Sequence, residues 1–417
     1  MFRVKPESRG SKKSQTRNHQ TKKPGTNQPG TNQPETANPQ TRKPNNQATI
    51  VNKILFITSE FPPQPGGIGV HAHQLARHLS NRFEVEILAD QRSNQGEEER
   101  KFDKSHAFKI TRVFRLKFIF FTYLQRISLA LQKSKTSDLI LVSGKFSLWL
   151  GGLLSLFSSK PIIAIIHGSE VQLSNTLARK MTNWSLSRLN EVIAVSNFTL
   201  SLIKDVKLKS TCVIPNGIYL EDFKTKNQSL KTTKNSHQLQ LITVGNLTQR
   251  KGQHNVINAL PKLIKKHPNL KYHCVGIPTD EDRIKELISR LNIKGNVIVH
   301  GRLIEDEKNK LIRQSDIFIM LSEQTLTGDV EGFGIAILEA NAQGLPAIGS
   351  ENCGIEDAIK DGYSGKLVNP HQPQEIEQAI EEIVNNYESY SSQSQLHAQQ
   401  FDWSKIGAKY VEVLQRY

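Results

Sequence analysis

The chain has 417 residues, 37% of them hydrophobic and 23% charged, which is long enough for two globular domains. Its longest apolar run, residues 146–157, is too short for a transmembrane helix, and we expect no secretory signal in the polar N-terminus. Three widely spaced cysteines argue against a disulfide framework or a structural zinc site and favour a reducing compartment.

The net charge of +16 is unevenly distributed along the chain. Residues 1–50 contain ten Lys or Arg and two acidic residues, so half of the excess positive charge lies in this short segment. The segment is rich in Asn, Gln, Thr, Pro and Lys and has almost no apolar surface, so we expect a disordered, solvated tail. The alternative is a tail that tethers the protein to an anionic surface.

A first α/β domain is expected over residues 51–223. The strands 54–57 and 84–88 flank a glycine-rich turn, Gly66-Gly67-Ile68-Gly69, and a helix over 70–79. This order is typical of a βαβ unit in a doubly wound parallel sheet. Further apolar strands are expected at residues 139–142, 162–166, 191–195 and 212–214.

A basic and apolar stretch lies within this domain, at residues 109–131. The apolar residues that share one face of its predicted helix are Phe120, Leu124, Ile127 and Leu131. One interpretation is an ordinary helix that covers the sheet with this face. The other is an interfacial patch on anionic lipid, because Lys and Arg side chains flank the aromatic residues.

A second α/β domain is expected over residues 239–400, after a polar linker at 224–238. Its expected strands are 241–244, 271–275, 296–299, 317–320, 347–348 and 365–368, with an apolar helix starting within 331–344. We expect a last helix, residues 401–417, to pack back on the first domain. Two successive Rossmann-like halves place a ligand in the cleft between them, at the carboxyl ends of the strands.

The most informative stretch is Glu331-Gly332-Phe333-Gly334-Ile335-Ala336-Ile337-Leu338-Glu339. A helix that starts near Gly334 has free amides and a positive dipole end, which can bind a diphosphate. Glu339 can accept hydrogen bonds from a ribose diol, and Glu331 can accept them from sugar hydroxyls. The alternative is that the two glutamates simply flank a buried helix, with the glycines forming the turn.

Other motifs accompany this stretch in a fixed order: Gly66-Gly67-Ile68-Gly69, His167-Gly168-Ser169-Glu170, Val195-Ser196-Asn197-Phe198, Pro215-Asn216-Gly217-Ile218, and Val244-Gly245-Asn246-Leu247 leading to Arg250-Lys251-Gly252. Together they resemble the GT-B-fold glycosyltransferases of family 4, the group 1 glycosyltransferases. The resemblance covers residues 53–417. It implies an α/β protein with two Rossmann-like domains facing across a cleft. It also implies a retaining enzyme that transfers a hexose from a nucleotide diphosphate sugar.

The resemblance implies catalytic roles for His167, Lys251 and Glu331. In the family, the matching lysine neutralises the donor diphosphate, and the matching histidine hydrogen-bonds a hydroxyl of the donor sugar. The implied donor-binding residues are Gly67, Gly69, Asn246, Arg250, Lys251, Glu331, Gly332, Phe333, Gly334, Ile335 and Glu339.

Asn246 departs from the family, which usually has an arginine at this position, and Arg250 is a candidate to supply the missing charge. His71 and His73 are weaker candidates for acceptor contact, and by default we expect them on the surface. We expect no metal or other cofactor, because Lys251 and the helix N-terminus can neutralise the diphosphate.

The sequence leaves several nucleotide sugar donors and several acceptors as alternatives. The segment Gln324–Val330 resembles mannosyltransferases that act on phosphatidylinositol mannosides, which suggests GDP-mannose over UDP- or ADP-linked donors. We expect a hydroxyl acceptor in glycolipid or polysaccharide synthesis, which can be lipid-linked. The expected location is the cytoplasm, with peripheral contact to an anionic membrane.

Two rival functions are considered. One is a nucleotide-sugar epimerase or phosphorylase on the same fold. The other is a non-enzymatic nucleic-acid-binding protein, suggested by the positive net charge. The concentration of this charge in the tail argues against specific nucleic-acid binding by the folded body.

Overall fold

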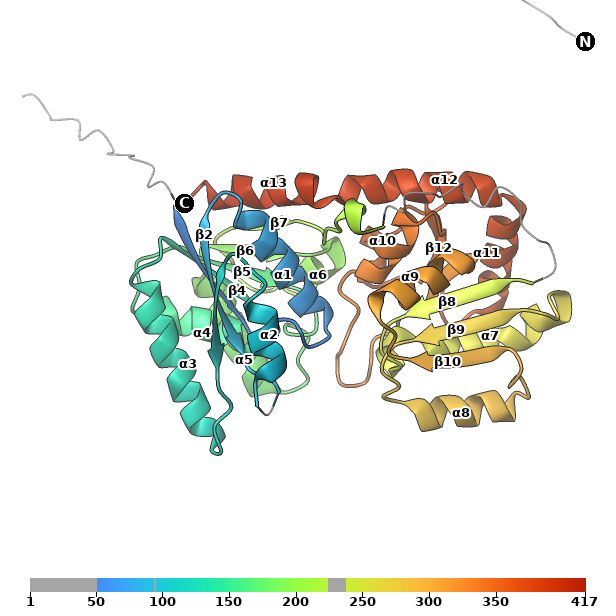
Figure 1. The fold of residues 1–417 in the computed structure, drawn as a ribbon, viewed down its shortest axis with the longest axis horizontal. Coiled ribbons are helices and arrows are strands. Elements are labelled where there is room, and N and C mark those ends of the chain that lie inside the picture. Colours follow the sequence, from blue (N-terminus) through green and yellow to red (C-terminus); the bar gives the residue numbers. More distant parts are fainter. Residues whose placement is uncertain (1–50, 94, 224–237) are drawn as a thin grey trace, which may run out of the picture. The chain divides into compact units, whose positions relative to one another are not determined.

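The computed structural model describes residues 51–93, 95–223 and 238–417, which form two parallel β-sheets flanked by helices (Figure 1). The predicted tail over residues 1–50 lies outside the described residues, as does the predicted linker except for residue 238. None of the helices in the described part of the chain is long and apolar enough to span a bilayer.

The first sheet has seven parallel strands in the order β3-β2-β1-β4-β5-β6-β7. In that order, the strands are Lys109–Val113, Glu84–Asp90, Lys53–Thr58, Leu139–Ser143, Ile162–Ile166, Glu191–Ala194 and Thr211–Val213. Its α-helices, α1 to α6, are Gly67–Leu79, Glu97–Asp103, Ile119–Ser134, Lys145–Leu154, Thr176–Arg188 and Asn197–Ser201; a 3₁₀ turn, η1, spans Leu220–Phe223.

Helices cover both faces of the first sheet. The side chains of β1 therefore alternate between two hydrophobic cores. Ile54 and Phe56 lie in one core together with side chains of α1. Leu55 and Ile57 lie in the other core, together with Leu148 of α4. A strand buried on both faces needs a continuous apolar run, which is why this strand was predictable.

The second sheet has six parallel strands in the order β10-β9-β8-β11-β12-β13. In that order, the strands are Val297–Gly301, Lys271–Val275, Gln240–Val244, Ile317–Met320, Ala347–Ser350 and Gly365–Val368. The helices α7 to α13 are Gln253–Lys266, Glu281–Arg290, Glu305–Gln314, Ile335–Ala342, Pro373–Asn385, Tyr387–Ala398 and Trp403–Leu414. Short 3₁₀ turns, η2 to η4, are Gln249–Lys251, Gly354–Asp357 and Gln399–Phe401. The prediction of two Rossmann-like parallel sheets is confirmed.

The C-terminal helix α13 packs against α1 of the first sheet's domain (Figure 1). The Trp403 indole N–H donates to Gln74 Oε1 at 2.7 Å, and the Tyr410 hydroxyl lies 3.1 Å from His71 Nε2. Trp403 and Tyr410 are both fully buried. The end of the chain is therefore part of the core that holds α1 in place.

The sequence interpretation missed the edge strand β3, Lys109–Val113. Its first residue is exposed and its second and third are half-buried, so polar and basic side chains interrupt the apolar pattern. Arg112 is nevertheless buried, because its guanidinium pairs with Asp103 at 2.6 Å and donates to the Pro62 carbonyl at 2.7 Å. A buried arginine with these partners carries no apolar signal in the sequence.

The face of α3 that is turned toward the sheet differs from the apolar face that the sequence predicted for this role. Phe120 and Leu124 are 62% and 45% exposed, so this interpretation is wrong for both, whereas Ile127 and Leu131 are partly buried against the core. The buried residues of the helix are Thr122, Arg126, Ala130 and Ser134. Arg126 pairs with Asp90 at the end of β2, which explains why a polar face is turned inward.

Candidate active site

Lys251 is positioned by a tight turn between β8 and α7. Gly252 has φ +70°, and a Cβ there would lie 1.6 Å from the Leu321 carbonyl oxygen at the end of β11. Only glycine allows this close backbone approach together with a left-handed conformation. The turn therefore fixes Lys251 against the carboxyl ends of β8 and β11, where its side chain is only 15% exposed.

Lys251, Arg250 and Glu331 form one charged cluster, so the structure brings three predicted site residues together. Lys251 Nζ lies 2.8 Å from Glu331 Oε2, and the Arg250 guanidinium contacts the same oxygen. Arg250 Nε also lies 3.0 Å from Asp329 Oδ2. Burial alone would raise the pKa of Glu331, but the two cations lower it to about 2. Burial lowers the pKa of Lys251, and Glu331 opposes this effect.

The start of α10 lies directly after this cluster. Gly334 is left-handed with φ +89°, and the helix begins at Ile335, which is half-buried. The Phe333 side chain is buried in the core near Phe401, with 5.9 Å between ring centroids. Phe333 can therefore offer only backbone groups to a ligand, and one of these already hydrogen-bonds Glu331.

Glu339 lies in the second turn of α10 and pairs with Lys308 of α9. The distance from Lys308 Nζ to Glu339 Oε2 is 3.1 Å, and Glu305 lies 2.6 Å from the same ammonium. Burial would lower the pKa of Lys308, but the two carboxylates hold it above its ordinary value. The sequence analysis missed Lys308, because it occurs in a highly charged helix and only the fold brings it to Glu339.

His167 follows β5 and is buried. Its Nε2 lies 3.0 Å from Ser143 Oγ at the end of β4, and its backbone N–H donates to Glu170 Oε1 at 2.6 Å. Burial lowers the pKa of His167 to about 3, so the imidazole is neutral at physiological pH. Burial also raises the pKa of Glu170 to about 7. His167 is thus a neutral hydrogen-bonding group that Ser143 and Glu170 hold in position.

The motif of His167 contacts the segment that holds Glu331. A Cβ on Gly332 would lie 1.7 Å from the His167 carbonyl oxygen, so only glycine fits at this position. The Thr199 hydroxyl donates to the Gly332 carbonyl at 3.3 Å. Two predicted motifs from different sheets therefore meet through their backbones.

Gly67 and Gly69 lie in the first turn of α1, since this helix begins at Gly67 and not at the predicted residue 70. A Cβ on Gly69 would lie 3.3 Å from the backbone of Glu60 and Phe61, whereas Gly67 faces open space. Gly69 thus keeps the start of α1 close to the segment that follows β1.

Asn246 is exposed, and its Oδ1 accepts from the Ile277 N–H at 3.3 Å.

The expectation that His71 and His73 lie on the surface is wrong. His71 is fully buried, with its ring centroid 5.0 Å from that of His167, and burial lowers its pKa well below the ordinary value. His73 is half-buried and lies 2.7 Å from His106 through their Nε2 atoms. Burial lowers the pKa of His73 to about 4. His71 is buried because α1 packs against α13 and the first sheet. No local sequence pattern reveals this packing.

No group of three His, Cys, Asp or Glu side chains in the described part of the chain is arranged to hold a metal ion. Asp329, the acidic residue nearest to Glu331 in the sequence, has its carboxylate on Arg250.

Comparison with known proteins gives a consistent result. Residues 224–399 match the family model described as glycosyl transferases group 1, and residues 65–222 match glycosyltransferase family 4. The chain is 24% identical to an uncharacterised glycosyltransferase of Methanocaldococcus jannaschii, over 87% of this chain and 98% of that protein.

A second relative is a GDP-mannose-dependent alpha-(1-6)-phosphatidylinositol monomannoside mannosyltransferase of Mycolicibacterium smegmatis. It is 23% identical, over 79% of this chain and 89% of that protein. Among solved structures, Anabaena HepE in complex with UDP and glucose aligns with a TM-score of 0.73 and 20% identity. The alignment covers 88% of this chain and 100% of HepE, and this likeness supports the GT-B fold.

Proposed function

Because the chain belongs to the group 1, family 4 glycosyltransferases, we propose that it transfers a hexose from a nucleotide diphosphate sugar to a hydroxyl acceptor, with retention of the anomeric configuration. The observation that carries this proposal is the cluster of Lys251, Arg250 and Glu331 beside the start of α10. Cations beside free helix amides are suited to a diphosphate.

The charge balance of the cluster explains how a diphosphate could enter it. The two cations face two carboxylates, so the cluster is close to neutral before the donor binds. The Asp329 side chain is 43% exposed and the Glu331 side chain only 10%, so Asp329 is the partner that water can more easily solvate. Arg250 can therefore exchange Asp329 for a phosphate oxygen while Glu331 keeps Lys251 in place.

The proposed reaction takes place on one face of the sugar. The bond between C1 and the phosphate oxygen breaks, the acceptor oxygen bonds to C1 on the same face, and its proton passes to the leaving phosphate. Lys251 and the amides of α10 stabilise the negative charge that develops on this phosphate. Neutral His167 hydrogen-bonds a sugar hydroxyl. Glu331 is unsuited to be a covalent nucleophile, because its carboxylate is held by two cations.

The proposal also covers the donor sugar, the acceptor class and the absence of a metal requirement. Mannose from GDP-mannose is the first donor to test, since one relative is named as GDP-mannose-dependent, and HepE with bound UDP makes UDP-glucose the second. The acceptor belongs to glycolipid or polysaccharide synthesis. The reaction needs no metal, because Lys251, Arg250 and α10 supply the positive charge.

The test is a transfer assay with UDP-, GDP- and ADP-linked hexoses and with lipid and oligosaccharide acceptor fractions. We expect acceptor-dependent consumption of one donor, a product with the anomeric configuration of the donor by NMR, and the same rate with a chelator. Inversion would overturn the retaining mechanism, and loss of activity with the chelator would overturn metal independence. Formation of an epimer or of a sugar phosphate without acceptor would favour an epimerase or a phosphorylase.

A further inference from the structure

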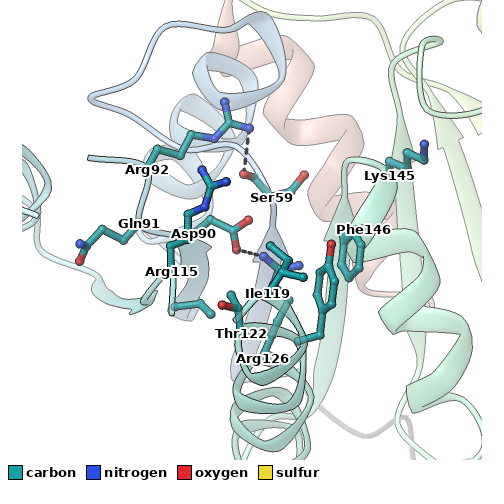
Figure 2. A pocket seen from close by; sticks show the side chains of 12 residues that line it. Ser59, Asp90, Gln91, Arg92, Arg115, Ile119, Thr122, Arg126, Lys145 and Phe146 are labelled. Carbon is teal, nitrogen blue, oxygen red and sulfur yellow. Dashed lines mark hydrogen bonds and ion pairs between the residues drawn. The ribbon is translucent and has the colours of Figure 1, made fainter. Parts of the chain in front are cut away.

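A pocket of about 560 Å³ lies in the first sheet's domain, where β1, β2 and β3 end (Figure 2). Twelve residues line it, and they come from the ends of these three strands, including the residues directly after them, and from helices α3 and α4. The carboxyl ends of parallel strands are where α/β proteins bind their ligands. None of the residues that line this pocket belongs to the proposed donor site.

The lining of the pocket is strongly positive. Four of the residues are cations, namely Arg92, Arg115, Arg126 and Lys145, and Asp90 is the single carboxylate among the twelve. Asp90 is already paired with Arg126, whose Nη2 lies 2.5 Å from Asp90 Oδ1 (Figure 2). Arg92 lies 3.6 Å from Glu60, outside the lining, so Arg115 and Lys145 are the lining cations without a carboxylate partner among the described residues, which favours an anionic ligand.

One wall of the pocket is a fixed platform. The Arg126 side chain is only 9% exposed, and its guanidinium lies 4.6 Å from the centroid of the Phe146 ring. Tyr123 stacks on Phe146 at 4.4 Å with the ring planes 5° apart. These contacts hold Arg126 in one orientation. Guanidinium groups are good ligands for phosphate because they donate two parallel hydrogen bonds.

An apolar surface adjoins the mouth of the pocket. We call the exposed residues Phe118, Ile119, Phe120, Phe121 and Leu124 the α3 apolar face; each is at least 45% exposed. Ile119 belongs both to this face and to the pocket lining. Residues 114–124 contain two cations, Arg115 and Lys117, and no acidic residue. Exposed aromatic side chains with flanking cations are typical of surfaces that insert into an anionic lipid interface.

The pocket also adjoins the proposed catalytic residues. Arg92 Nη2 donates to the Ser59 carbonyl at 3.3 Å and lies 3.6 Å from Glu60, which packs against Gly66. On the other side, Lys145 follows Gly144 and Ser143, and the Ser143 hydroxyl contacts His167. A molecule anchored in the pocket is therefore next to the groups that would position the sugar.

We propose that this pocket binds the phosphate group of a membrane-bound amphiphile that serves as the hydroxyl acceptor, while the α3 apolar face contacts its hydrocarbon part. That the bound molecule is the acceptor rests on the proposed function. The new element is the chemical class of this acceptor. The inward turn of Arg126 neutralises Asp90, which leaves Arg115 and Lys145 to supply the charge of the pocket. The same orientation of α3 leaves the phenylalanines at its start exposed.

The experiment measures binding of three probes to the full-length protein: inorganic phosphate, monomeric dihexanoyl phosphatidylglycerol, and vesicles of phosphatidylcholine with or without phosphatidylglycerol. A pocket variant carries Arg115→Gln and Lys145→Gln. A face variant carries Phe118→Ser, Phe120→Ser and Phe121→Ser. The control variant is Lys135→Gln, which removes an exposed cation from the other end of α3.

We expect wild type to bind anionic vesicles more tightly than neutral ones, and to lose this preference in about 0.5 M salt. The pocket variant should bind the anionic vesicles and the short-chain lipid at least tenfold more weakly. The face variant should lose vesicle binding but keep binding of inorganic phosphate, and the control should behave as wild type.

Wild type that ignores anionic vesicles, or a pocket variant that binds them as wild type does, would overturn the proposal. Equal affinity for inorganic phosphate and for the short-chain lipid, without vesicle binding, would show a site for a soluble anion and would also overturn it. Nucleoside diphosphate binding is measured in parallel. Its absence from wild type would count against the proposed function alone, since the lipid probes do not depend on the donor site.

Discussion

Two regions of this protein that are rich in cationic side chains differ in how their charge is balanced. In the donor cluster, Lys251 and Arg250 are matched by Glu331 and Asp329, and all four residues come from two short segments. In the pocket of the first sheet, Arg126 pairs with Asp90 and Arg92 lies near Glu60, while Arg115 and Lys145 have no carboxylate partner among the described residues. A balanced cluster can exchange a carboxylate for a phosphate oxygen, whereas an unbalanced pocket keeps a standing affinity for anions.

The two regions also differ in what their charge can do: stabilise a transition state in one, and capture a ligand in the other. Lys251 is buried against Glu331, so its charge is aimed at one place and can stabilise a transition state. Arg115 and Lys145 are exposed at the pocket mouth, where charge contributes to capture and orientation of a ligand. We therefore expect changes in the first region to affect turnover and changes in the second to affect acceptor binding.

The largest effect is expected for Lys251→Ala. Loss of a cation that stabilises the leaving phosphate should lower kcat by on the order of 100-fold or more, with little change in stability. Steady-state kinetics of donor consumption measure the effect, and circular dichroism checks the fold. Lys265→Ala, which removes an exposed cation from the same region of the chain, is the matched control. A normal kcat in the variant would show that Lys251 does not act on the leaving group.

A smaller effect is expected for Glu339→Ala. If Glu339 accepts hydrogen bonds from the ribose, its loss should weaken nucleoside diphosphate binding by about 1–3 kcal/mol in calorimetry. Glu339→Gln should weaken binding less, because the amide oxygen can still accept. Glu388→Ala, an exposed glutamate on α12, serves as control. Unchanged affinity in a folded Glu339→Ala protein would remove this residue from the donor site.

The prediction for Glu170→Gln concerns stability and not activity, and it is an effect of pH. The pKa of Glu170 is about 7 in the folded chain, against 4.5 as its ordinary value. Between these values the unfolded state has lost the proton that the folded state keeps, so wild-type stability falls as pH rises, by at most about 1.4 kcal/mol per pH unit from this group.

The glutamine variant lacks this dependence, so its stability relative to wild type should rise between about pH 4.5 and pH 7 and stay level above. Denaturant unfolding at a series of pH values measures this difference. Parallel curves for the two proteins would mean that Glu170 does not titrate in this window.

Lys251, Arg250 and Glu331 were singled out from the sequence, but their ion pairs with one another were not predicted, and neither was the pocket. Glu331 and Glu339 flank a glycine turn in one short segment, so their spacing survives in the sequence. Buried strands such as Ile162–Ile166 were equally clear, because both faces of the sheet are covered and every residue is apolar.

Three features could not be read from local patterns because tertiary contacts decide them. Lys308 meets Glu339 only when α9 packs beside α10. His71 is buried only because the distant helix α13 covers it. The orientation of α3 follows from the pairing of Arg126 with Asp90, which turns Arg126 inward and leaves Phe120 and Leu124 of the predicted apolar face exposed.

The role of Lys251 is tested most directly by titrating a nucleoside diphosphate, UDP or GDP, into wild type, Lys251→Ala and Arg115→Gln. We expect saturable binding to wild type, affinity at least tenfold weaker in Lys251→Ala, and wild-type affinity in Arg115→Gln. Wild-type affinity in Lys251→Ala, or an equal loss in both variants, would contradict the assignment of the donor diphosphate to the Lys251 cluster.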